Sequence, residues 1–334
     1  MPVMGNGRAA RRSPAPQARR AGIVLAGTVV AVALVLVSLT LLVAHHQGSA
    51  SHQGSASRRV TAGSSVRPKN ATAPTAGPVV SASPAADRNP FATTVRAYLE
   101  SRSGTVLAAV YDTRTGQLWT AGHGDAQDEA SIVKLDILET LLAQHHASNT
   151  RLSSGDVLLA TEMMEDSDNA AATALWNAVG GAAGIRSFNQ SVGLAGTTPS
   201  ECVTCAGFSW PGWGLTRTTP TDQITLLRQL LVANAQLSTR QRRFVLGLME
   251  NVAPSQRWGV TSGVPADVTV ALKNGWLPLT SAGDDWQINS IGCVFGDRRS
   301  YLIAMLSTDD PTEQYGIDTI DELSAMVWAR MGAS

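Results

Sequence analysis

The spacing of hydrophobic residues divides the chain into parts with different structures. Residues 21–44 form an apolar run without a charge. At ~1.5 Å per helical residue, this run is long enough to cross the ~30 Å hydrocarbon core of a bilayer. Residues 45–88 are rich in Ser, Ala, Thr, Pro and Gly, a composition that cannot bury enough apolar surface to fold. We therefore expect a tail over 1–20, a transmembrane anchor, a disordered linker, and a folded domain over 89–334.

Within the folded domain, strand-like and helical spacing occupy different regions. Strands are predicted at both ends, over 105–111, 117–121, 268–273, 286–295 and 301–307. Helices are predicted over 91–99, 154–164, 170–179, 223–235, 238–249 and 317–331, and directly after Ser131. This order predicts an α+β fold, in which the first two strands join the last three in one five-stranded antiparallel sheet. Helices would flank the sheet, an all-helical lobe would pack beside it, and the active site would lie between the two.

The charges around the apolar run predict its orientation. Five arginines precede it and none follows closely: Arg8, Arg11, Arg12, Arg19 and Arg20. The positive-inside rule then places the N-terminus in the cytoplasm and the folded domain outside the cell. A cleaved signal peptide is the alternative, but its apolar region is usually only ~7–15 residues long. We favour an uncleaved, single-pass anchor in the cell membrane with an extracytoplasmic domain.

Overall composition narrows the possible partners. The chain has 334 residues, 44% of them hydrophobic, and a formal net charge of zero. This length allows one large domain plus extra segments, and the balanced charge gives no reason to expect nucleic acid as a partner. A direct repeat in the linker contains His46 and His52. Metal binding there is one interpretation, but a passive spacer is the better one, and we expect no metal or cofactor.

The candidate nucleophile is Ser131, three residues before Lys134 at the start of a predicted helix. Positions three apart lie on one helix face, so the two side chains would point the same way. A serine hydroxyl is a poor nucleophile without an adjacent base. A lysine amine can be that base if burial or a nearby cation keeps it neutral. This spacing is also common on solvated helices, so the pair alone proves little.

Two further motifs follow in order: Ser167-Asp168-Asn169, and Lys273-Asn274-Gly275. Together with Ser131 and Lys134 they match the S-x-x-K, S-D-N and K-T-G set. The chain thus resembles the class A β-lactamase-like serine hydrolases, which share these motifs with penicillin-binding proteins. The resemblance runs from about Asn89 onward and includes Val179-Gly180-Gly181 and Thr218-Thr219-Pro220. It implies the same α+β fold.

The resemblance also implies a role for each motif residue. Ser131 would be the nucleophile and Lys134 its base or proton relay, while Ser167 passes a proton to the leaving group with help from Lys273. Asn169 would hold a substrate amide, and Lys273 would attract a substrate carboxylate and keep Lys134 neutral. The N–H groups of Ser131 and Trp276 would form the oxyanion hole. Gly275 would let the substrate backbone lie close to the strand.

Three features depart from the class A pattern. We count Asn274 among the substrate-binding residues, together with Asn169, Gly275 and Trp276. It stands where the motif has a hydroxyl residue, however, which puts its contact with a substrate carboxylate in doubt. The segment between Lys134 and Ser167 is short, so we expect a trimmed helical lobe. The deacylating glutamate is not obvious: Glu201 lies at a suitable distance before Thr218, but Cys202 and Cys205 beside it do not resemble the usual loop. Its catalytic role stays open.

The cysteines and tryptophans give two further expectations. An extracytoplasmic location favours oxidation, so we expect a Cys202–Cys205 disulfide and a free, buried Cys293. A zinc site would need further ligands nearby, and none are evident. Trp210 and Trp213 would form either an aromatic wall for substrate beside Trp276 or packing for an irregular loop.

The sequence thus predicts a membrane-anchored, outward-facing serine hydrolase that cleaves an amide, lactam or ester through an acyl-Ser131 intermediate. Its substrate would be a small molecule or a cell-wall peptide. A D-Ala-D-Ala peptidase or an esterase is the alternative among enzymes, and a non-hydrolysing β-lactam or wall-binding module is the alternative outside them. Because the glutamate is doubtful, we expect slow or negligible hydrolysis of penicillins and a long-lived adduct if one forms.

Overall fold

The computed structural model describes residues 89–205, 211–279 and 283–332. The expected tail, membrane anchor and linker lie outside these residues. Among the described helices, none is both long and apolar enough to cross a membrane.

The folded domain is built on a five-stranded antiparallel sheet in the order β2-β1-β7-β6-β5. Its strands are β1 (Thr105–Asp112), β2 (Gln117–Ala121), β5 (Thr269–Pro278), β6 (Trp286–Gly296) and β7 (Arg299–Asp310). The first hairpin therefore joins the C-terminal strands through the β1–β7 pair, as the sequence predicts. A separate two-stranded sheet pairs β3 (Gln127–Asp128) with β4 (Arg217–Thr218).

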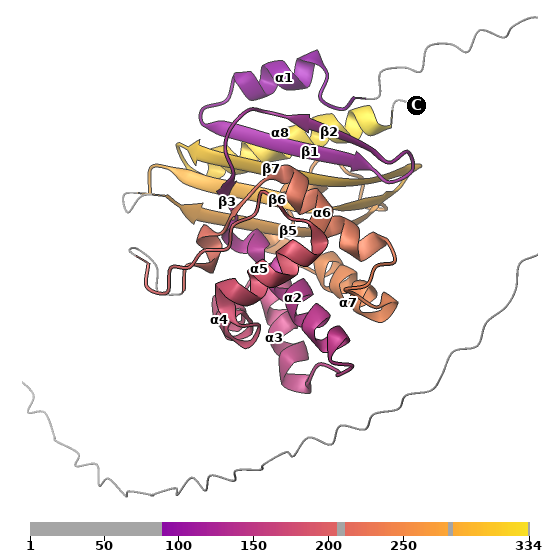
Figure 1. Cartoon of the computed structure of the whole chain (residues 1–334). Helices are drawn as coiled ribbons and strands as arrows, with labels where there is room; N and C mark the ends of the chain where they lie inside the picture. Colours follow the sequence, from indigo (N-terminus) through magenta and orange to yellow (C-terminus); the bar gives the residue numbers. More distant parts are fainter. Residues whose placement is uncertain (1–88, 206–210, 280–282, 333–334) are drawn as a thin grey trace, which may run out of the picture. The chain divides into compact units, whose positions relative to one another are not determined.

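Helices cover both faces of the large sheet (Figure 1). One face packs against α1 (Thr93–Glu100) and α8 (Glu313–Met331). The helices on the other side are α2 (Val133–Ala147), α3 (Ser154–Glu165), α4 (Asn169–Ala178), α5 (Gly181–Val192), α6 (Pro220–Leu231) and α7 (Thr239–Glu250). Short 3₁₀ turns are η1 (Ala130–Ile132), η2 (Trp213–Leu215), η3 (Pro254–Gln256) and η4 (Gly259–Thr261).

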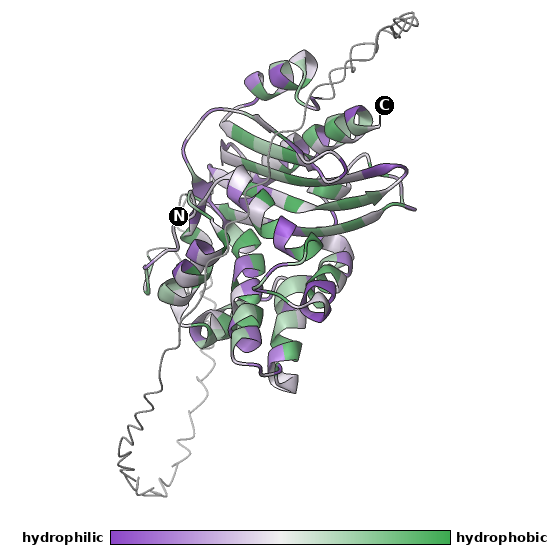
Figure 2. Ribbon diagram, turned by 45° about the vertical axis from the view of Figure 1, so that its right-hand side comes forward, coloured by the Kyte–Doolittle hydropathy of each residue, from purple (hydrophilic) through white to green (hydrophobic). Residues whose placement is uncertain are grey.

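The two faces of the large sheet pack against two separate hydrophobic cores. On β1, Leu107 and Ala109 belong to the core of the helical lobe, whereas Val106, Ala108 and Val110 belong to the core under α8. This is the period-two alternation of a strand. Because both faces of β1, β5, β6 and β7 are buried, these four strands carry many hydrophobic residues (Figure 2), whereas the edge strand β2 is largely exposed.

The structure confirms the predicted α+β fold and corrects several element boundaries. Strand β5 runs on to Pro278, so Lys273, Asn274 and Gly275 lie inside the strand instead of at its end. Helix α5 was not predicted, because Gly180-Gly181 indicates a helix end. Gly180 does end the preceding segment in a left-handed conformation, with φ 93°, but α5 begins at the next residue.

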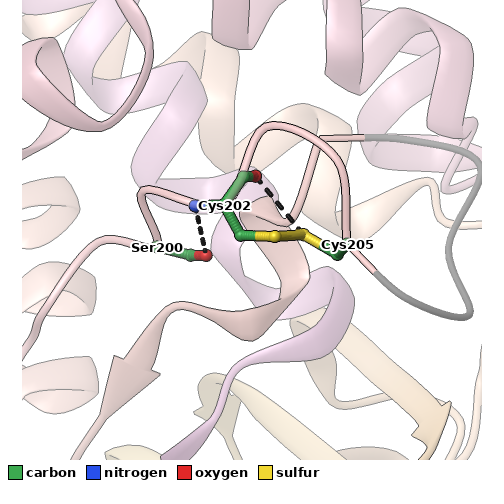
Figure 3. Close-up of a disulfide and its surroundings, with 3 residues drawn as sticks. All are labelled: Ser200, Cys202 and Cys205. Atoms are coloured by element: carbon green, nitrogen blue, oxygen red, sulfur yellow. Dashed lines mark hydrogen bonds between the residues drawn. A yellow bond between two sulfur atoms is a disulfide. The ribbon is translucent and has the colours of Figure 1, made fainter.

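The cysteine prediction is confirmed. Cys202 and Cys205 form a disulfide (Figure 3), and Cys293 is a free thiol buried in β6. The Gly212 N–H donates to the Cys202 carbonyl at 2.7 Å, so the disulfide-bonded turn is tied to the residue directly before Trp213.

Three buried carboxyl groups line the inside of the helical lobe near Ser131. Glu129, Asp136 and Glu139 are fully buried. Burial, reinforced by the charge of Asp136, raises the pKa of Glu129 and Glu139 well above the usual range. Burial also raises the pKa of Asp136 to about 7. Burial therefore favours the protonated form of Glu129 and Glu139, whereas Asp136 loses its proton near pH 7.

Replacing Asp136 should stabilise the protein in a pH-dependent way. An aspartate in an unfolded chain has a pKa of ~3.9, so between about pH 4 and about pH 7 the folded state holds this proton more tightly. Stability contributed by the group is thus lost as pH rises through this window. Asp136→Asn cannot ionise, so its gain in unfolding free energy over wild type should be larger at pH 8 than at pH 5, by ~1 kcal/mol or more.

Urea unfolding at the two pH values measures this difference. Asp125→Asn is the matched control, because Asp125 is exposed and should show no such trend. An equal effect of Asp136→Asn at pH 5 and pH 8 would contradict the prediction.

Candidate active site

The candidate nucleophile lies on a tightly held turn. Ser131 is half-buried in η1, immediately before α2. The residue before it, Ala130, has a φ of 50°, a left-handed conformation that costs a non-glycine residue ~1–2 kcal/mol. The Glu129 carbonyl accepts hydrogen bonds from Asn289 Nδ2 at 2.8 Å and from the Ile132 N–H at 3.2 Å. The turn is thereby anchored to strand β6.

Lys134 points from the first turn of α2 to the loop between α3 and α4. Its Nζ lies 2.6 Å from the Ser167 carbonyl, 3.0 Å from Ser167 Oγ and 2.8 Å from Asn169 Oδ1. Ser167 has a φ of 57°, and this left-handed bend turns both its carbonyl and its hydroxyl toward the lysine. The first two motifs therefore meet directly.

Lys273 reaches the same hydroxyl from strand β5. Its Nζ lies 3.0 Å from Ser167 Oγ and 2.9 Å from the Asn274 carbonyl. A hydroxyl can accept one hydrogen bond while it donates another. Ser167 can thus accept from a charged Lys273 and donate to the lone pair of a neutral Lys134. The three motifs are joined through one oxygen atom.

Both lysine amines are easier to deprotonate than a lysine in water. Burial lowers the pKa of Lys134 to about 6, with a further lowering from the charge of Lys273 and a partial offset from Asp168. Burial alone lowers the pKa of Lys273 to about 7. At neutral pH, Lys134 is therefore mostly a free amine and can accept a proton.

In this structure Lys134 bonds to Ser167 and Asn169 and not to the Ser131 hydroxyl. Its Nζ also lies 5.0 Å from the centre of the Trp213 ring. Catalytic hydrogen bonds often tighten only when substrate is bound. The arrangement places the Lys134 amine, the candidate base, one helical turn from the candidate nucleophile Ser131.

Strand β5 approaches the nucleophile more closely than a side chain would permit. A Cβ atom on Gly275 would lie 2.6 Å from the Ser131 nitrogen and 2.9 Å from the Glu129 carbonyl oxygen. Glycine is thus required here for steric reasons. Because β5 is an edge strand, its backbone groups on this side have no partner strand. The expected oxyanion hole from the N–H groups of Ser131 and Trp276 stays a prediction.

A cavity of about 290 Å³ opens above Ser131. It is lined by Ala130, Ser131, Asp166, Ser167, Asn169, Trp213, Gly214, Gln256, Trp276, Leu277, Pro278 and Trp286. Trp213 and Trp276 thus face the cavity, whereas Trp210 lies outside the described residues. Of the other lining residues, Asp166 directly precedes the Ser167-Asp168-Asn169 motif, and Trp286 is the first residue of a predicted strand. Nothing in the sequence marks Gln256.

The Asn274 side chain does not reach this cavity. Its Nδ2 donates to the carbonyls of Gln256 and Trp258, at 2.8 Å and 3.1 Å, and its Oδ1 accepts from Ser290 at 2.6 Å. Alternation along β5 puts Asn274 on the opposite face from Lys273. This position corrects the expectation that Asn274 contacts substrate.

Glu201 is also outside the site. Its carboxylate pairs with Arg186 at 2.5 Å, its side chain is 75% exposed, and it borders a different cavity beside α5. The loop bends at the disulfide and presents Trp213, not Glu201, to the Ser131 cavity. The structure therefore corrects the assignment of Glu201 as a candidate catalytic residue.

Comparison with known proteins agrees with this geometry. A family model described as "Beta-lactamase enzyme family" matches residues 144–331, more than half of the chain. This match includes Ser167 and Lys273 and begins after Ser131 and Lys134. A Mycobacterium tuberculosis protein named "Putative lipoprotein LppW" is 29% identical over 217 residues, which cover 62% of this chain and 65%, less than two thirds, of that protein.

Solved structures share the fold at low sequence identity. The TLA-1 extended-spectrum β-lactamase aligns with a TM-score of 0.62 and 17% identity, over 72% of this chain and 97% of that one. A class A β-lactamase from Bacteroides cellulosilyticus aligns with the same TM-score and identity, over 74% of this chain and all of that one. At this identity the likeness shows the fold alone.

The lysine pair predicts how the reactivity of Ser131 depends on pH. A base acts in its unprotonated form, so the rate of Ser131 modification by a neutral fluorophosphonate should rise through about pH 6, where Lys134 loses its proton. Lys273→Met removes the neighbouring positive charge and should move this rise to higher pH. Intact-protein mass spectrometry over time measures the rate.

Arg257→Met is the matched control, because Arg257 donates to the Glu250 carbonyl outside the cavity. It should leave the pH of the rise unchanged. A rise that stays in place, or moves to lower pH, in Lys273→Met would contradict the coupling between the two amines.

Proposed function

The chain belongs to the beta-lactamase enzyme family, and from this membership we propose that it is a serine hydrolase that cleaves an amide, lactam or ester through an acyl-Ser131 intermediate. One observation carries the proposal. Ser167 Oγ lies 3.0 Å from the Nζ atoms of both Lys134 and Lys273. A hydroxyl shared between a neutral and a charged amine can accept a proton from one side and donate one to the other, which supports its role as a proton relay.

Acylation begins with attack by Ser131 Oγ on the substrate carbonyl. Lys134 takes the hydroxyl proton, and the negative charge that develops on the carbonyl oxygen is stabilised by the N–H groups of Ser131 and Trp276. The bond to the leaving group then breaks. Lys134 gives its proton to Ser167 Oγ while Ser167 gives its own proton to the leaving nitrogen or oxygen. The positive charge of Lys273 stabilises the Ser167 oxygen during this exchange.

Deacylation repeats these steps with water as the nucleophile. Lys134 is again neutral after acylation and is the base nearest to the acyl group. Among the described residues that line the cavity, Asp166 is the one carboxylate, and it is exposed. A carboxylate base dedicated to the attacking water would contribute ~10²–10⁴-fold. Because Lys134 has to serve both steps, we propose slow turnover and a long-lived acyl-enzyme with penicillins.

The small number of carboxylates among the described lining residues also supports a second candidate function. A site that acylates but lacks a dedicated water-activating carboxylate would also suit a non-hydrolysing β-lactam or cell-wall-binding module. A D-Ala-D-Ala peptidase or an esterase fits the same acylation machinery. The lifetime of the acyl-enzyme separates the enzymes from the binding module.

We further propose that the domain is held at the outer face of the cell membrane by residues 21–44. The Arg-rich start and the uncharged apolar run support this topology. The mycobacterial relative is named as a lipoprotein, which is consistent with attachment to a membrane. The disulfide between Cys202 and Cys205 suits an oxidising, extracytoplasmic location.

Ser131→Ala should abolish covalent modification by a fluorophosphonate probe, and Lys134→Ala should reduce it at least ~100-fold because the serine loses its base. Ser187→Ala on the exposed face of α5 is the matched control and should react like wild type. Mass spectrometry locates the adduct, and circular dichroism checks the fold. Undiminished modification of Ser131→Ala would refute the mechanism.

The topology predicts that protease added to intact cells releases the folded domain by cutting within 45–88. An antibody against the domain would follow its loss from the cells, and a cytoplasmic protein would serve as the control for lysis. Cutting that occurs only after the cells are permeabilised would show that the orientation is reversed.

A further inference from the structure

The cavity above Ser131 has an unusual distribution of charge for a site expected to hold a carboxylate-bearing substrate. Among the described lining residues, Asp166 is the one charged side chain. Its carboxylate is exposed, so it contributes negative potential at the mouth of the cavity. A substrate carboxylate that entered beside it would meet a like charge.

The two nearby cations make no direct contact with the cavity. Lys134 and Lys273 are both fully buried, and both amines are directed at Ser167. Lys273 also donates to the Asn274 carbonyl. Neither amine lines the cavity. The lowered pKa values of both lysines further reduce their average charge at neutral pH.

Neighbouring strand positions supply no replacement. Asn274 has both of its side-chain atoms bonded on the far face of the sheet, and its partner there, Ser290, is neutral. On β6, the residues beside this end of β5 are Gln287 and Asn289, which are uncharged. Arg257 follows a lining residue but donates to the Glu250 carbonyl. The two internal segments that the structure does not describe, 206–210 and 280–282, contain no Lys or Arg in the sequence.

The rest of the wall is apolar and aromatic. Trp213, Trp276 and Trp286 border the cavity together with Leu277 and Pro278. Trp276 is held edge-to-face by Trp258, with ring centroids 6.0 Å apart. The Trp286 Nε1 donates to the Gly283 carbonyl at 2.9 Å, which fixes the orientation of its ring. Rigid aromatic faces of this kind bind apolar groups at a low entropic cost.

We propose that the Ser131 site selects neutral esters with apolar acyl groups, and disfavours substrates that carry a carboxylate close to the scissile bond. This inference rests on the proposed acyl-Ser131 mechanism and adds its substrate class. The apolar acyl group packs on Trp276 and Trp286, while Asp166 repels an acid. A penicillin carries a carboxylate beside its lactam. It is then a poor substrate because of the wall, and also because no glutamate is among the described residues that line the cavity.

The ester reaction needs water as its only co-reactant. Ser131 Oγ forms a bond to the acyl carbon, the bond from that carbon to the alcohol oxygen breaks, and the serine proton leaves with the alcohol through Lys134 and Ser167. Water then cleaves the acyl–serine bond. It gives its hydroxyl group to the released acid and returns a proton to Ser131.

A matched pair of esters tests the selection. p-Nitrophenyl valerate and mono-p-nitrophenyl glutarate have five-carbon acyl groups and the same leaving group, and they differ in a terminal methyl against a terminal carboxylate. For the full-length chain in detergent, with the Ser131→Ala rate subtracted, we expect kcat/KM to be at least tenfold higher for the valerate. Burst amplitude and adduct mass report acylation even if turnover is slow.

Two variants test whether residues that line the cavity cause this substrate preference. Asp166→Asn should raise kcat/KM for the glutarate about threefold or more, which reduces the preference for the valerate over the glutarate. Added salt should reduce the same preference, because it screens exposed charges. Trp286→Ala should raise KM for the valerate with a smaller effect on kcat. Leu158→Ala is the control for an exposed apolar residue, because Leu158 is 58% exposed on α3, outside the cavity.

The outcomes separate the two proposals. If fluorophosphonate modifies Ser131 but the glutarate reacts as fast as the valerate, or neither ester acylates Ser131, the selection is refuted and the nucleophile stands. If the selection ratio persists unchanged in Asp166→Asn and at high salt, the charge argument is refuted. If no reagent modifies Ser131, the proposed function itself fails.

Discussion

The site depends on the burial of two lysine amines around one hydroxyl. Each amine loses solvation when it is removed from water, and each lies within 3.0 Å of Ser167 Oγ. The two positive charges would therefore be at most about 6 Å apart, where like charges repel strongly in a protein interior. The protein resolves this conflict by releasing a proton from Lys134. The neutral amine that the proposed mechanism needs is thus a consequence of packing, because the three motifs bring the two lysines together in a buried place.

The fold and the motif residues could be predicted because both leave local signals in the sequence. Period-two and helical spacing mark the strands and most helices, and Ser131, Lys134, Ser167 and Lys273 lie in short motifs with fixed internal spacing. Helix α5 left a weaker signal, because its glycine-rich start is typical of a helix end. The disulfide could be predicted from two cysteines three residues apart and the expected compartment.

The walls of the site could not be predicted, because they depend on how irregular loops fold back. Glu201 and Trp213 lie in one loop, and the sequence does not indicate which of them faces Ser131. The Asn274 side chain points away from the cavity because side chains alternate along β5. The sequence predicts that this strand ends at Lys273, so it does not reveal the direction of Asn274. Gln256 enters through a 3₁₀ turn and a hydrogen bond from its Nε2 to the Asp166 carbonyl at 2.9 Å. The residues in motifs could therefore be predicted from the sequence, whereas the loop residues that line the cavity could be identified only from the structure.

The contact at Gly275 has a consequence for how this fold varies between proteins. At this point the sheet and the nucleophile turn meet backbone to backbone, since no side chain fits between them. Their separation is therefore fixed by the dimensions of the main chain, which are the same in every protein. Side chains in either core can be exchanged without changing the distance between the edge strand and the serine. A catalytic geometry that is set in this way can survive when most of the surrounding sequence has diverged.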